Sequence, residues 1–456
     1  MTHPRNGDGA AAPIHDVKKA RKAGITAFAG TTIEWFDFYI YGTASALVLG
    51  KLFFPDASPA VGTLAAFATF AVGFLARPVG GIVFGHFGDK FGRKNAVVIT
   101  LAMMGVGTVG VGLLPTYETI GIWAPIALVT LRVVQGIAMG GEWGGAVLIA
   151  TEFAPPKKKV LYGAFAQQGS PVGNLMATVA FLALTAMSDS VFESWGWRIP
   201  FVASALLVVI ALYIRLHISE TPEMEKAVAK QERARLPLIQ VLRSHPIELA
   251  LGVGAVVAGV AITYVKTTFA LSWATTDLGF ERGDFLLVIT FALVAQVIIQ
   301  PFGAILATRI DPSRAIKWML LPELVLLPLM FFLIQTGSVA WAMVGMMLAT
   351  APHAMYYAAL AGILAQVFPT NVRYTGISLS YQFSTAIFAG TAPLLSQFLL
   401  TATGSIWVVV GLGLFYVLLS VVCMSALLRR GKRLALIEAD DPTTPTAFST
   451  IAKAES

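Results

Sequence analysis

Two carboxylate side chains, Glu34 and Asp37, stand in a stretch of the chain that is otherwise mostly apolar. Residues three apart on a helix lie one above the other on the same face, and Tyr41 continues that face. Two carboxylates this close disfavour double ionisation, and burial disfavours the charged form further. One of them could therefore take up a proton near neutral pH. The alternative is that both are permanently paired with cations and serve structure alone.

A second polar stripe contains an arginine. Arg132, Gln135 and Glu142 share one face of a later apolar stretch, and Trp143 adjoins that face. An ionisable side chain inside a membrane span costs at least a few kcal/mol, so it usually faces a cavity or a partner. Arg132 could attract a carboxylate substrate, or it could form an ion pair with one of the acids above. An ion pair that breaks and re-forms during transport would satisfy both interpretations. The predicted proton-coupling residues are therefore Glu34, Asp37, Arg132 and Glu142.

Further candidates for binding a substrate lie mostly in the second half of the chain, and Gln135 and Trp143 of the stripe above are also predicted to bind it. Lys266 is deep in an apolar stretch, where a lysine is a counter-ion for an anionic substrate unless it snorkels outward. Other polar residues could hydrogen-bond a substrate, although such residues often only join helices: Tyr41, His353, Tyr356, Tyr357, Tyr381 and Gln382. We find no set of metal ligands and expect no cofactor.

The elements that position these side chains are long apolar segments. The chain of 456 residues is 56% hydrophobic and 12% charged, whereas a soluble domain carries about a quarter charged residues. A helix needs about 20 apolar residues to cross a bilayer, and continuous apolar runs exclude a barrel. The sequence predicts an all-α membrane protein with twelve spans, at 25–50, 61–86, 95–114, 122–153, 160–187, 197–216, 247–276, 284–308, 316–335, 339–366, 373–400 and 405–428.

The net charge of +7 is distributed unevenly between the predicted loops. With both termini in the cytoplasm, only Lys51, Arg198 and Arg282 among the lysines and arginines of the predicted loops fall outside. This asymmetry follows the positive-inside rule, so the basic residues indicate topology and are not a nucleic-acid footprint. Cys423 is the only cysteine, which excludes an intrachain disulfide and a thiolate metal cluster.

The chain divides into two similar halves. We predict a cytoplasmic tail at 1–24, six-helix bundles at 25–216 and 247–428, a cytoplasmic central loop at 217–246 and a disordered cytoplasmic tail at 429–456. The motif Pro-Val-Gly at 78–80 corresponds to Pro-Phe-Gly at 301–303. Internal repeats are common in transporters, whose substrate sites lie near the midplane between the repeats.

The loop GHFGDKFGRK at 85–94 lies between two apolar runs. Its glycines allow a tight turn, and its aspartate and neighbouring cations can form a charge lock at a membrane face. The corresponding loop of the second half lacks the glycine and is a weaker lock. Arg77 lies closer to the cytoplasmic end of its span, where it would snorkel or brace the gate. The predicted gating residues are Arg77, Gly85, Asp89, Lys90, Gly92, Arg93, Asp311 and Arg314.

This loop resembles the signature of the major facilitator superfamily, which reads roughly G-x-x-x-D-R/K-x-G-R-R/K. Other motifs are similar to those of its metabolite:H⁺ symporter family: TIEWFDFY at 32–39, GFLARPVGG at 73–81, RVVQG at 132–136, GGEWGG at 140–145, WGWRIPF at 195–201 and ETP at 220–222. The resemblance covers most of the first half and is less sharp in the second. It implies proton-coupled import by alternating access, and it makes Arg132 a candidate for substrate or proton coupling.

The resemblance does not fix the substrate, since the family includes permeases for shikimate, 2-oxoglutarate, citrate, and proline or betaine. Three membrane cations, Arg77, Arg132 and Lys266, favour a symporter for a small organic acid, which the proton gradient drives. We expect a monomer in a bacterial-type inner or plasma membrane. A proline or betaine permease is the alternative, but such relatives often carry a long C-terminal coiled coil, and this tail has no sustained heptads. A drug exporter is less favoured, and the motifs of common enzyme classes are absent.

Overall fold

The computed structural model describes residues 17–91, 93–140, 159–216, 237–368 and 373–440. These residues form helices joined by short turns, and no strand occurs among them. A helix lies within each of the twelve predicted spans, so the predicted fold class is confirmed. Long apolar helices are the expected solution because each backbone N–H and C=O in lipid has to find its partner within the segment.

The first half consists of helices that run up to residue 216. Their bounds are Val17–Ala44 (α1), Ser45–Leu49 (η1), Gly50–Phe53 (α2), Pro59–Leu75 (α3), Arg77–Phe91 (α4), Arg93–Leu113 (α5), Tyr117–Ile120 (α6), Trp123–Met139 (α7), Lys159–Ala183 (α9), Leu184–Ala186 (η3), Asp189–Ser194 (α10), Gly196–Arg198 (η4) and Ile199–Leu216 (α11).

The second half begins after the central loop. Its helices are Pro237–Ser244 (α13), Pro246–Tyr264 (α14), Val265–Phe269 (η5), Ala270–Thr276 (α15), Arg282–Arg309 (α16), Pro312–Leu320 (α17), Glu323–Gln335 (α18), Val339–Val367 (α19), Arg373–Ser384 (α20), Thr385–Ala389 (η6), Ala392–Thr403 (α21) and Ile406–Asp440 (α22).

Length and composition identify the membrane-crossing segments. Among the described residues, nine helical segments are long and apolar enough to cross a bilayer, and Val98–Leu113 and Trp123–Met139 are shorter apolar helices. Large apolar side chains on the outside of the bundle, such as Val106 and Trp318, are exposed. Such a surface is compatible with lipid and would be a liability in water.

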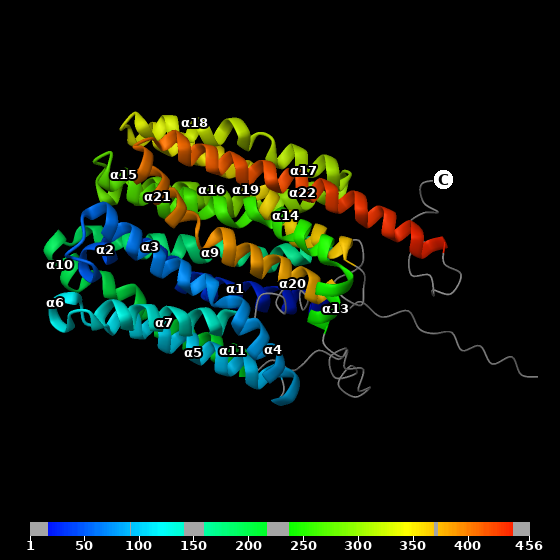
Figure 1. The fold of residues 1–456 in the computed structure, drawn as a ribbon, viewed down its shortest axis with the longest axis horizontal. Helices are drawn as coiled ribbons and strands as arrows, with labels where there is room; N and C mark the ends of the chain where they lie inside the picture. The colour runs from blue at the N-terminus through cyan, green and yellow to red at the C-terminus, as the bar shows by residue number, and fades with distance from the viewer. Residues whose placement is uncertain (1–16, 92, 141–158, 217–236, 369–372, 441–456) are drawn as a thin grey trace, which may run out of the picture.

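The two halves lie side by side. Figure 1 shows the blue to cyan helices of the first half in the lower part of the view and most helices of the second half above them. The halves meet where α9 packs on α16 and α19, where α3 packs on α21, and where the η1 region faces η5 and α15. Within the first half, a Cβ at Gly173 would lie 2.6 Å from the Thr32 oxygen, so this glycine allows α9 to approach α1 closely.

Three π turns interrupt the helices in the part of the chain that the structure describes. η1 follows α1 and η5 follows α14, so the first span of each half changes its winding at a similar place, and η6 follows α20. π turns are rare and often occur at functional sites. Lys266 lies within η5.

Two helix ends, the C-terminus of α22 and the N-terminus of α1, differ from the predicted boundaries. The sequence places the end of the last span at residue 428 and disorder after it, whereas α22 continues to Asp440. One physical reason is an ion pair, because Arg430 Nη2 lies 2.9 Å from Glu248 Oε1 on α14. Likewise α1 begins at Val17, inside the predicted N-terminal tail.

Candidate functional site

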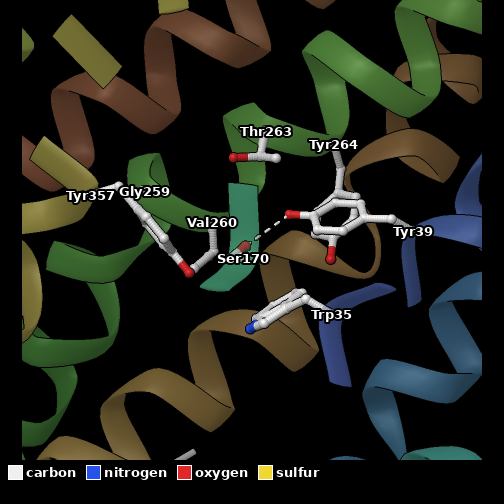
Figure 2. Close-up of a pocket in the computed structure, with 8 residues that line it drawn as sticks. All are labelled: Trp35, Tyr39, Ser170, Gly259, Val260, Thr263, Tyr264 and Tyr357. Carbon is white, nitrogen blue, oxygen red and sulfur yellow. Dashed lines mark hydrogen bonds between the residues drawn. The ribbon is translucent and has the colours of Figure 1, made fainter. Parts of the chain in front are cut away.

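A small cavity lies between the two halves. Its volume of about 10 Å³ is roughly the space that one water molecule needs. It is lined by Trp35, Tyr39, Ser170, Gly259, Val260, Thr263, Tyr264 and Tyr357. Figure 2 shows these residues around the cavity, with the hydrogen bond between Tyr39 and Ser170 drawn as a dashed line. Ligand pockets usually measure roughly 300–1,000 Å³, so the halves are closed tightly around this space. The sequence singled out Tyr357 but did not predict the other lining residues as substrate contacts.

Aromatic rings and hydroxyl groups make up much of the cavity wall. The rings of Tyr39 on α1 and Tyr264 on α14 lie 5.5 Å apart between their centroids, which brings the two halves into contact. The Tyr357 hydroxyl lies 3.1 Å from the Tyr381 hydroxyl. Tyr356, which was also predicted to bind the substrate, instead donates to the Ala255 carbonyl at 2.5 Å, so it joins α19 to α14.

A chain of buried hydrogen bonds links Asp37 to Arg132. Thr108 donates to Asp37 Oδ2 at 3.0 Å, and Gln135 Nε2 donates to the Thr108 hydroxyl at 2.8 Å. Arg132 Nη1 in turn donates to Gln135 Oε1 at 2.8 Å. The structure therefore brings together three residues that the sequence predicted: Asp37, Arg132 and Gln135. The neutral Thr108 connects Asp37 to Gln135, and the sequence did not predict this role. Arg132 and Asp37 form no direct ion pair. Glu34, one turn earlier on α1, is also buried.

Aromatic rings surround the Arg132 guanidinium. Its Cζ lies 3.9 Å from the Tyr41 ring centroid and 4.9 Å from that of Phe38, and cation–π attraction is stronger away from water. A Cβ at Gly73 would lie 2.5 Å from Arg132 Nη2, and one at Gly107 would lie 2.5 Å from Gln135 Cγ. These two glycines therefore make the room that the hydrogen-bonded chain needs, which the sequence alone did not indicate.

Arg77 is fully buried at the junction of the halves and does not snorkel. Its Nε donates to Gln382 Oε1 at 3.1 Å, and Gln382 Nε2 donates to the Gly140 carbonyl at 3.0 Å. The Arg77 Cζ lies within 5.7 Å of the ring centroids of Trp35, Phe38 and Phe74. Its Nη1 and Nη2 atoms have no hydrogen-bond partner among the described residues. Arg77 is thus a buried cation with unused hydrogen-bond donors, and it lies beside the Trp35 ring, which lines the cavity.

A second polar cluster lies within the C-terminal half. Lys266 is buried, and its Nζ lies 3.4 Å from both the Ala349 carbonyl and the Thr350 hydroxyl. Lys266 is not among the residues that line the cavity. His353 Nε2 lies 2.9 Å from the Thr263 hydroxyl, and its Nδ1 lies 3.7 Å from Glu323 Oε1. The sequence analysis missed Glu323, although an acid within the apolar span 316–335 was the signal that could have found it.

An ion pair joins the halves at the end of the bundle that the sequence places outside the cell. Arg282 Nη1 lies 3.1 Å from Asp189 Oδ1. The Arg282 Cζ also lies 4.0 Å from the Phe192 ring centroid. This ion pair and the Arg77–Gln382 hydrogen bond are thus two polar contacts between the halves.

The predicted gate loops are described only in part. The burial of Gly85 and the side chains of Asp89, Lys90 and Arg93 are not among the features described, and Gly92, Glu142 and Trp143 lie outside the described residues. In the second half, Asp311 Oδ1 accepts the backbone N–H groups of Ser313 at 2.9 Å and Arg314 at 3.3 Å. Asp311 therefore caps the N-terminus of α17, a favourable place for a carboxylate.

Known proteins resemble the chain along most of its length. A family model described as "Sugar (and other) transporter" matches residues 22–250. The shikimate transporter of Escherichia coli (strain K12) is 39% identical over 396 residues, which cover 86% of this chain and 90% of the relative. A proline/betaine transporter of the same strain is 33% identical over 400 residues, which cover 86% of this chain and 80% of the relative. The solved structure of the proton:xylose symporter XylE matches with a TM-score of 0.72 at 16% identity, covering 90% of this chain and 96% of that one.

Proposed function

The chain belongs to the metabolite:H⁺ symporter family of the major facilitator superfamily, and from this premise we propose that it imports a small organic acid together with protons. The protein is a membrane transporter and not an enzyme. Import would proceed by alternating access, in which the two halves rock around a site between them. The cavity bounded by Trp35 and Tyr39 from one half and Tyr264 and Tyr357 from the other is the site that this mechanism uses.

The single observation that carries the choice of an acid is the pair of buried arginines. Arg77 and Arg132 are both fully buried, and each has guanidinium nitrogens without a hydrogen-bond partner among the described residues. A buried donor without a partner costs free energy, and more so on a charged group. A substrate carboxylate entering the cavity would supply the missing acceptors, and the arginine fork can bind it through two parallel hydrogen bonds.

One observation favours the second candidate, a zwitterionic osmolyte such as betaine. The cavity is lined by the rings of Trp35, Tyr39, Tyr264 and Tyr357. Aromatic rings attract quaternary ammonium groups through their π-systems, while the carboxylate of the same ligand would still meet an arginine. The acid is preferred because the charged side chains beside the cavity wall are cations, which attract an anion. Arg77 lies beside the lining residue Trp35, and Arg132 lies beside Phe70, whose ring packs on the lining residue Tyr264.

Uptake into vesicles distinguishes these candidates. Purified protein in proteoliposomes would be offered labelled shikimate, 2-oxoglutarate, citrate, proline and betaine, with and without a pH gradient. We expect accumulation of at least one of the acids, and only when the outside is the acidic side. Accumulation of proline or betaine alone would assign the protein to the osmolyte class, and uptake indifferent to the pH gradient would refute proton coupling.

The orientation in the membrane has its own test. The positive-inside asymmetry places the loop that contains Ser188 outside and the loop that contains Arg243 in the cytoplasm, and both residues are exposed. In a Cys423→Ser background, Ser188→Cys should react with an impermeant maleimide in intact cells. Arg243→Cys should react only after the membrane is opened. The opposite labelling pattern would reverse the proposed topology.

A further inference from the structure

Glu323 is a buried acid that the proposed transport mechanism does not use. It lies in the first turn of α18, directly after the break between α17 and α18, and its side chain is fully buried. Neither of its carboxylate oxygens has a hydrogen-bond partner among the described residues. A fully ionised carboxylate without hydrogen bonds in a low-dielectric interior is expensive, whereas the neutral acid is much less so. Glu323 is therefore suited to exist in two protonation states.

Few charged groups face this acid. His353 on α19 places Nδ1 3.7 Å from Glu323 Oε1, and Lys266 on η5 is the other cation nearby, held by Ala349 and Thr350. Lys266 makes no contact within 4.0 Å of Glu323 among the described ion pairs. α22 and α17 also pack on α18. In the described part of the chain, none of their titratable side chains forms a hydrogen bond or ion pair with Glu323: Tyr416, Cys423, Arg429 and Arg430 on α22, and Arg314 and Lys317 on α17.

A continuous route joins Glu323 to the cavity. Thr263 lines the cavity, and its hydroxyl lies 2.9 Å from His353 Nε2. The opposite ring nitrogen of His353 faces Glu323. The imidazole thus separates the acid from the cavity, and its two nitrogens face the two ends of the route. In the tautomer with the proton on Nδ1, Nε2 accepts a hydrogen bond from the Thr263 hydroxyl.

We propose that Glu323 is a second proton-binding site, separate from Asp37 and reached from the cavity through Thr263 and His353. The Thr263 hydroxyl passes its proton to His353 Nε2 and takes a replacement from the cavity. The proton on Nδ1 passes to Glu323 Oε1, which becomes a neutral carboxylic acid, and the imidazole returns to a neutral tautomer. Asp37 belongs to the N-terminal half and Glu323 to the C-terminal half, so each half carries a proton site of its own.

Infrared difference spectroscopy tests the site without any substrate. The spectra compare purified protein across roughly pH 5 to 9, a range that brackets ordinary carboxyl and imidazole titrations. In an Asp37→Asn background we expect a carboxylic-acid C=O band that grows as the pH falls, and we expect Glu323→Gln to remove it. Glu248→Gln is the matched control, because Glu248 is also buried in this half but is paired with Arg430. Identical spectra with and without Glu323→Gln would overturn the proposal.

Transport stoichiometry provides a second readout, which rests on the proposed function. With the membrane potential clamped at zero and a gradient of about one pH unit, each coupled proton multiplies the accumulation ratio by about ten. Labelled shikimate is the probe, replaced by whichever acid the uptake panel identifies. We expect Glu323→Gln to lower the ratio about tenfold and Glu248→Gln to leave it unchanged. An unchanged ratio in folded Glu323→Gln would show that Glu323 carries no coupled proton, while the infrared result stands independently of any substrate.

Thr263→Val keeps the proposal testable if Glu323→Gln does not fold. This substitution keeps the shape of the side chain and removes the hydroxyl that opens the route. After a rapid drop in pH, the C=O band should appear at least about tenfold more slowly than in wild type, because a general acid–base step typically contributes 10²–10⁴-fold. An unchanged rate would overturn the route through Thr263.

Discussion

Asp37→Asn is expected to lower substrate accumulation at least about tenfold under a gradient of about one pH unit, because one coupled proton is lost. Asparagine keeps the shape of the side chain and can still accept the hydrogen bond from Thr108. It cannot bind and release a proton in the range where a carboxylate does. Exchange of internal for external substrate should therefore survive, since exchange needs reorientation of the loaded carrier and no net proton movement.

Accumulation and exchange are measured in the same proteoliposomes, so that loss of one with retention of the other identifies uncoupling and not unfolding. Asp277→Asn is the matched control, because Asp277 is an exposed acid at the end of α15 and should leave both rates unchanged. Glu34→Gln tests the neighbouring acid of the pair. If accumulation persisted at the wild-type level in both Asp37→Asn and Glu34→Gln, the proton would be carried elsewhere.

Arg132→Lys is expected to weaken substrate binding by roughly 30-fold or more, because losing a buried charged contact costs about 2–5 kcal/mol. The charge is kept, so the loss would come from geometry. Lysine cannot donate through a planar fork, and it cannot at once lie over the Tyr41 ring and bond Gln135 as the guanidinium does. The chain of hydrogen bonds from Arg132 to Asp37 would be broken at its first step.

Calorimetry on purified protein measures this affinity with the acid that the uptake panel identifies. Arg198→Lys is the matched control, since Arg198 also stacks on an aromatic ring, that of Trp197 at 4.5 Å, and donates to backbone carbonyls. Arg198 takes no part in the hydrogen-bonded chain of Arg132 and Asp37 but bonds the Gly112 and Leu114 carbonyls, so its substitution should leave the affinity unchanged. Equal affinities of wild type and Arg132→Lys would remove Arg132 from the binding site.

The fold could be predicted from the sequence because a membrane helix is specified locally. A run of about 20 apolar residues satisfies its own backbone hydrogen bonds, so helices appear within all twelve predicted spans. The charged residues of the first half were also found easily, since an acid or arginine stands out in an apolar run. Asp37, Gln135 and Arg132 do meet in one hydrogen-bonded chain.

The contacts between distant helices could not be predicted in the same way. Which face of a helix meets the cavity depends on how all its neighbours pack. Tyr356 and Tyr357 were both predicted to bind the substrate, yet Tyr357 lines the cavity and Tyr356 bonds the Ala255 carbonyl. Lys266 was expected to meet the substrate, and it instead contacts Ala349 and Thr350. The aromatic surroundings of Arg77 come from α1 and α3, and no spacing within its own span indicates them.

The π turn η5 makes the helix contacts of its span depend on the number of residues in the span as well as on their types. An α-helix rotates by about 100° per residue, and a π turn accommodates one residue more than an α turn. Everything after η5 is therefore turned relative to an unbroken helix, which brings the Trp273 ring to 5.6 Å from the Phe331 ring between centroids. Removing a single residue from Val265–Phe269 would therefore restore α-helical winding and leave the Trp273 ring against α18. The same deletion in an α-helical stretch of this span would turn every later residue by about 100°, so η5 is the place where the span can lose one residue and keep its contacts.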